Sequence, residues 1–196
     1  MTATAATRTA DSAAQPKGSP MTTTLLNPER QFLGCVMQVR HTAARRLLAG
    51  MRADDFGSPV AAHVLQLVIE LTAAGHAPTP IAVMDHAREK TICSPRSGGA
   101  NRLRSLGLWI VETYTNGPIL PPPYYGSWLK ALVLKDAYRR AVREHAARLV
   151  QAVEDDSPTD VLRHRLDDTE RLDDLWQRYR DAGGNDEPTA RLEVAA

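Results

Sequence analysis

Apolar residues recur along most of the chain at intervals of three or four positions, the spacing of one face of an α-helix. A first helical segment begins at Asn27-Pro28, where an N-cap residue precedes a proline in the first helical position. Another begins at Ser58-Pro59 and stops at Gly75. We find no convincing alternation typical of strands and no repeat at a fixed period. The pattern therefore predicts an all-α protein.

The same pattern predicts four regions. Residues 1–24 are rich in Ala, Thr and Ser and lack periodic apolar positions, so we expect a disordered leader. Residues 25–120 hold short helical segments separated by Gly and Pro, which predict a compact helical head. Residues 121–181 hold two long amphipathic segments separated by Ser157-Pro158, which predict a long antiparallel helical hairpin. We expect residues 182–196 to form a flexible tail.

The segment MRADDF, residues 51 to 56, places two carboxylates beside one of the two phenylalanines of the chain. It is either an acidic chemical site or a connector between two helices. Asp54 and Asp55 precede the expected start of the next helix, where negative charge is favoured by roughly a few tenths of a kcal/mol. We therefore interpret the segment as a connector that places Phe56 in the core.

Composition narrows the class of protein. Hydrophobic residues make up 43% and charged residues 24% of the chain, and the formal net charge is +1. These values are ordinary for a globular protein and predict no strong overall field for nucleic acid. With two cysteines and no apolar signal segment, we expect reduced thiols and a cytoplasmic protein. No run approaches the roughly 18 apolar residues that a membrane span requires.

Motifs that carry chemistry are missing from the sequence. A phosphate-binding loop would read G-x-x-x-x-G-K-[ST], and the chain contains no such motif. It contains neither C-x-x-C nor H-E-x-x-H, the common metal-binding spacings. Asp167, Glu170 and Asp174 alternate with arginines, which favours solvated ion pairs over a metal site. We therefore expect no cofactor, no metal and no enzymatic activity.

Two sets of residues on the expected hairpin are candidates for binding a partner. An apolar set would either pack within the hairpin or join a second copy: Leu129, Val133, Leu149, Leu162, Leu166 and Trp176. A basic set would either contact phosphates or keep a helix soluble: Lys135, Arg139, Arg140, Arg143 and Arg148. Acidic residues follow the basic set closely and aromatic residues are sparse around it, which favours the second interpretation.

Taken in order, several short elements resemble the N-terminal domain of DnaB-type replicative DNA helicases over residues 25 to 181. Glu29 followed by Leu33-Gly34 resembles the first helix of that family, and the MRADDF segment resembles its acidic-Phe box. The other matching positions are Leu71, Gly75, Pro78, Val83, Gly98-Gly99, the segment TNGPILPPPYYGSWL and Arg139-Arg140.

This resemblance implies a stand-alone helicase N-domain without an ATPase domain in this chain. In the family such domains pair through their hairpins, form a collar on the helicase and bind primase. We therefore expect a homo-oligomer, a dimer or larger, that serves as a protein-interaction module in DNA replication and meets a helicase, a primase or a helicase loader. The alternative from the residues themselves is a small DNA-binding regulator that uses the basic helix.

Overall fold

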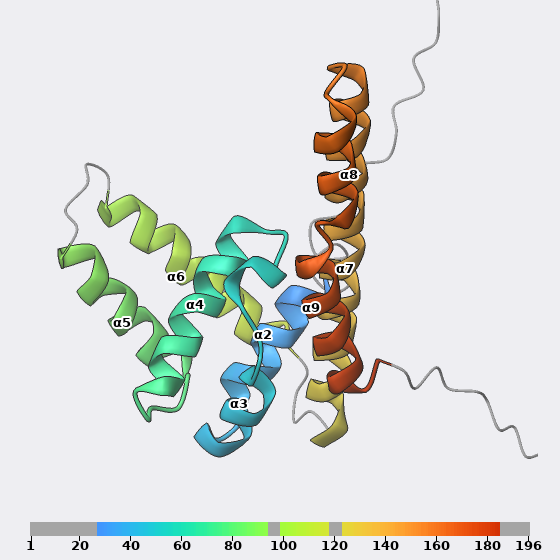
Figure 1. The fold of residues 1–196 in the computed structure, drawn as a ribbon. Helices are drawn as coiled ribbons and strands as arrows, with labels where there is room; N and C mark the ends of the chain where they lie inside the picture. Colours follow the sequence, from blue (N-terminus) through green and yellow to red (C-terminus); the bar gives the residue numbers. More distant parts are fainter. Residues whose placement is uncertain (1–26, 94–98, 118–122, 185–196) are drawn as a thin grey trace, which may run out of the picture.

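The structure is a computed structural model that describes residues 27–93, 99–117 and 123–184. Within those ranges it is helical and has no strand, which confirms the all-α prediction (Figure 1). None of these helices is long and apolar enough to cross a membrane. The predicted leader and most of the predicted tail lie outside the described residues.

The helices in chain order are α2 (Pro28–Gln38), α3 (His41–Leu48), α4 (Pro59–Ala73), α5 (Pro80–Cys93), α6 (Gly99–Thr115), α7 (Pro123–Glu154), α8 (Thr159–Asp167) and α9 (Glu170–Tyr179). A short 3-10 turn, η1 (Ala53–Asp55), precedes α4, and η2 (Arg180–Gly184) follows α9. The predicted starts are confirmed at two helices. Asn27 Oδ1 accepts hydrogen bonds from the backbone N–H groups of Glu29 and Arg30, and Ser58 Oγ accepts one from Ala61.

Helix α2 lies at the centre of the molecule and contacts α3, α4, α6 and α7. Its side chains Phe32, Leu33 and Val36 are fully buried. Phe56 packs edge-on against Phe32, with ring centroids 6.3 Å apart. The aromatic ring of the MRADDF segment therefore fills the core, as the connector interpretation requires.

The first half of α7 belongs to the same core as α2. Leu129, Val133 and Leu134 are buried together with the side chains of α2 and α4. The second half of α7 extends away from the body formed by α2 to α6, and α8 followed by α9 runs back along α7 (Figure 1). Helix α7 is therefore shared between the body and the extension.

The return segment consists of two helices, where the sequence predicts one. The backbone of Asp168 leaves the helical region at φ −77° and ψ 70°, and α9 starts again at Glu170. Asp and Thr side chains compete for backbone hydrogen bonds, which weakens a helix at Asp167-Asp168-Thr169. The two pieces differ in packing: α9 buries Leu175 against Ala137 and Ala141, whereas α8 buries no residue.

Helix α2 meets the end of α6 and the turn after it at two glycines, Gly34 and Gly117. A Cβ atom on Gly34 would lie 2.8 Å from the carbonyl oxygen of Thr113 and 3.0 Å from Cα of Gly117. Both neighbours are backbone atoms and cannot rotate away. A Cβ on Gly107 of α6 would instead meet only the flexible end of Met84, at 3.2 Å.

We predict that Gly34→Ala lowers the free energy of unfolding by about 1–3 kcal/mol, because α2 and α6 must separate. Alanine is the better helix former by about 1 kcal/mol, so helix propensity would raise the stability of Gly34→Ala. A loss of stability would therefore come from the close approach of the two backbones. Gly107→Ala gains the same propensity without a backbone clash and is expected to be neutral or stabilising. Urea unfolding followed by circular dichroism compares the two, and equal stability of both variants would contradict the prediction.

Candidate functional site

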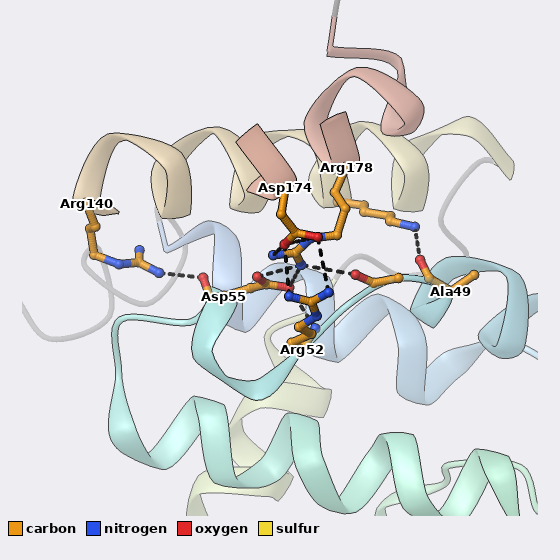
Figure 2. Close-up of polar contacts among 8 residues, drawn as sticks. Ala49, Arg52, Asp55, Arg140, Asp174 and Arg178 are labelled. Atoms are coloured by element: carbon orange, nitrogen blue, oxygen red, sulfur yellow. Dashed lines mark hydrogen bonds and ion pairs between the residues drawn. The ribbon is translucent and has the colours of Figure 1, made fainter. Parts of the chain in front are cut away.

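A polar junction connects η1, which follows α3, to the last helix, α9. The carboxylate of Asp55 is 1% exposed, and both of its oxygens have partners (Figure 2). The backbone N–H of Arg52 donates to Oδ2 at 2.7 Å. Nη1 of Arg178 lies 2.8 Å from each carboxylate oxygen. This contact joins residues 123 positions apart in the sequence.

Asp174 extends the junction to a second ion pair. Nε of Arg178 donates to Oδ2 of Asp174 at 3.0 Å, one helical turn away on α9. The guanidinium of Arg52 donates to both oxygens of the same carboxylate, at 2.9 and 3.1 Å. Two carboxylates thus alternate with two guanidinium groups, and the charges of the four side chains cancel. Parallel N–H···O bonds of this kind hold orientation as well as charge.

A neighbouring set of contacts connects the same connector to α2 and α7. Glu29 accepts hydrogen bonds from the backbone N–H groups of Gly57, at 2.6 Å, and Ser58, at 3.2 Å. Arg140 of α7 lies 3.5 Å from Glu29 and also donates to the carbonyl oxygen of Asp55. Figure 2 shows Arg140 and Arg178 reaching the connector from different helices. The MRADDF segment and the two residues that follow it, Gly57 and Ser58, are therefore the point at which α2, α7 and α9 are joined.

Burial dominates the electrostatics of this junction. It raises the pKa of the Asp55 carboxyl, while hydrogen bonds from the Arg52 backbone and from Arg178 act in the opposite direction. Burial likewise lowers the pKa of Lys130, whose Nζ donates to the carbonyl oxygen of Ala49 at 2.5 Å. Both oxygens of Asp55 are bonded to groups of the chain itself. The arrangement of the junction holds helices together, and within the described ranges no group of three metal-ligating side chains occurs.

Three of the candidate binding residues make their contacts within the chain. Leu129 and Val133 are buried in the core of the chain itself, so a partner cannot reach them. Their spacing is the same for an interface and for a core, which is why the sequence does not separate the two. Arg140 points inward to Glu29 and Asp55 and is not a free phosphate contact.

The remaining candidates lie on the surface or at its edge. Leu149 of α7 and Leu162 of α8 are half-buried, whereas Leu166 and Trp176 are exposed. The Trp176 ring packs against Tyr138 and Tyr179, with centroids 5.5 and 5.6 Å away. The exposed members of the basic set are Lys135, Arg139, Arg143 and Arg148.

Sequence reasoning missed the junction itself. Asp174 and Arg178 are spaced as an i, i+4 pair, which predicts a solvated contact on one helix. Nothing local distinguishes Arg178 from the other arginines of its segment. Only the buried Asp55, far away in sequence, gives Arg178 its role.

Comparisons of the chain with protein-family models, with curated proteins and with solved structures find no match.

A second polar cluster connects α4 to α5. Glu70 accepts a hydrogen bond from Gln66 at 2.8 Å and contacts Lys90, and His86 Nε2 lies 3.0 Å from its carboxylate. The contacts from Lys90 and Gln66 lower the pKa of Glu70 to about 2. A carboxylate with a depressed pKa in the folded state stabilises the fold above its unfolded pKa and ceases to do so as it is protonated.

We predict that removing one member of the junction is costly. Arg178→Met leaves the Asp55 carboxylate buried without its partner, and loss of one member of a buried pair costs about 3–5 kcal/mol. Arg171→Met removes a guanidinium from the same helix, but its partner Glu144 is exposed, so the expected cost is about 0–1 kcal/mol. Urea unfolding at neutral pH measures both. A similar small loss in the two variants would show that the junction contributes little.

We also predict an acid-sensitive contribution from Glu70. The wild-type melting temperature should fall as the pH is lowered from the ordinary glutamate value, 4.5, toward the folded value of about 2. Glu70→Gln has no carboxyl to protonate, so its melting temperature should fall less over that pH range. Near neutral pH its melting temperature should be lower than that of the wild type. Thermal melts of both proteins at a series of pH values test this, and parallel curves would exclude a role for Glu70.

Proposed function

We propose that the chain is a non-catalytic module resembling the N-terminal domain of DnaB-type helicases, and that it acts in DNA replication by binding other proteins. In this proposal a compact head carries a hairpin, and the far end of the hairpin binds a second copy. The head and hairpin together then dock onto a helicase collar, a primase or a helicase loader. The chain hydrolyses no nucleotide.

The observation that carries the proposal is the poor packing of the far end of α7 and α8. Helix α8 buries no residue, and a helix of nine residues gains little stability without tertiary contacts. Val153 and Leu166 are 65% and 58% exposed. We call the exposed apolar residues here the distal apolar surface: Val142, Val150, Val153, Val161 and Leu166. Apolar side chains that are exposed together are typical of a surface that binds another protein, and in this proposal these residues form such a surface.

A second copy fits this surface because both helices that carry it run past the body of the chain. Figure 1 shows the ends of α7 and α8 extending past the body formed by α2 to α6. Identical surfaces on identical chains form closed two-fold contacts, which bury the same residues twice. Such pairing would cover α8 and complete its packing.

The contacts of Glu29 and Arg140 beside the polar junction also support the resemblance. Glu29, the Asp55-Phe56 pair and Arg140 lie far apart in the sequence, and the resemblance rests on their order. In the fold Arg140 contacts both Glu29 and the carbonyl oxygen of Asp55. A shared structural role would explain why such elements occur together in one chain.

We predict that Val150→Arg with Val153→Arg disrupts self-association. In a two-fold contact each substitution is present twice, so like charges meet where apolar side chains were buried. Ile81→Arg is the matched control, because Ile81 is exposed on α5, away from the distal apolar surface. Light scattering at micromolar concentration should report a multimer for the wild type and for the control, and a monomer for the double variant.

A monomeric wild type at that concentration would contradict the self-association. The replication role has its own measurement, the binding of the immobilised chain to the replicative helicase and to the primase of the same organism. Binding of neither protein would exclude that part of the proposal.

A further inference from the structure

The first half of α7 exposes aromatic and basic side chains on the side turned away from the core. Tyr124 and Trp128 are 73% and 54% exposed, and Lys135 and Arg139 are exposed farther along the same helix. Steps of four, seven and four residues place these side chains on one helical face. At 1.5 Å per residue the face extends over about 22 Å. We call these four residues the aromatic-basic face.

Packing holds the aromatic end of this face in place. The Tyr125 ring stacks on Trp128, with centroids 5.5 Å apart and an interplanar angle of 25°. On the opposite side of the helix, Gly126 packs against Leu47 so closely that a Cβ would lie 2.8 Å from it. Leu129 is also buried there. The indole therefore presents a flat apolar surface to solvent and loses little conformational freedom when something stacks on it.

The basic side chains beside it are not neutralised. Lys135, Arg139 and Arg143 make no ion pair with any residue that the structure describes. By contrast, Arg140 on the inward side of the same helix is bonded to Glu29. Between Tyr124 and Arg143 the sequence has one acidic residue, Asp136, and it is half-buried. The local charge of the face is therefore positive, although the chain as a whole is nearly neutral.

We propose that the aromatic-basic face binds single-stranded nucleic acid. A base stacks on Trp128 and a second on Tyr124, while Lys135 and Arg139 contact phosphates of the same strand. Exposed rings favour a single strand, because the bases of a duplex are already stacked on each other. The inference does not depend on self-association, because the four residues of the aromatic-basic face all precede Val142, the first residue of the distal apolar surface.

Fluorescence anisotropy with labelled oligo(dT) and oligo(rU) tests the inference on the full chain at low salt. Wild type should bind, with an affinity that falls steeply as salt is added. Trp128→Ala leaves the charge unchanged and should weaken binding by about tenfold, because it removes a ring on which a base stacks. Lys135→Gln with Arg139→Gln should weaken binding and reduce the salt slope by about two.

Arg163→Gln with Arg165→Gln is the matched control, because it removes the same charge from exposed positions on α8. It should leave the affinity unchanged, and circular dichroism of all variants checks folding. A stronger response to oligo(dT) or to oligo(rU) identifies DNA or RNA as the preferred strand. Four results would overturn the inference: no binding at low salt, duplex bound as tightly as single strand, full affinity in Trp128→Ala, or an equal loss in the α8 control.

Discussion

The buried carboxylate of Asp55 is the constraint on which the arrangement of the last helices depends. A charge removed from water needs partners, and Asp55 obtains them from its own turn and from Arg178 on α9. Because Arg178 also binds Asp174, which binds Arg52, α9 has one orientation in which all four side chains are satisfied. Apolar contact alone, through Leu175 and the small residues of α7, would define the position of α9 less uniquely.

Helix α7 is thus packed differently at its two ends. Near the body, side chains such as Val133 are packed on several sides and leave no surface for a partner. At the far end the same helix is covered on one side only, by α8. The basic residues follow this division too, since Arg140 turns inward to the junction while Arg139 next to it stays in solvent. Adjacent positions on a helix point about 100° apart, which is enough to give two arginines opposite roles.

Much of the local structure could be predicted from the sequence, because caps and breakers act locally. Asn27, Ser58 and Gly75 define helix ends by hydrogen bonds or backbone angles that involve only a few neighbours. Long-range choices could not be predicted in the same way. The spacing of Leu129 and Val133 fits a core as well as an interface, and the partner of Asp55 lies 123 residues away. The break at Asp168 depends on the balance between helix propensity and packing, and α8 has too little packing to favour continuity.

From Ser127 to Glu154 helix α7 contains neither glycine nor proline, the residues at which helices commonly bend. It therefore works as a stiff spacer whose base is embedded among the side chains of α2. From Val133, which is fully buried in that base, to Val153 near the tip, the rise along the helix is about 30 Å. A partner bound at the tip is held at a fixed distance from the body. A rotation of one end of the helix also rotates the other end.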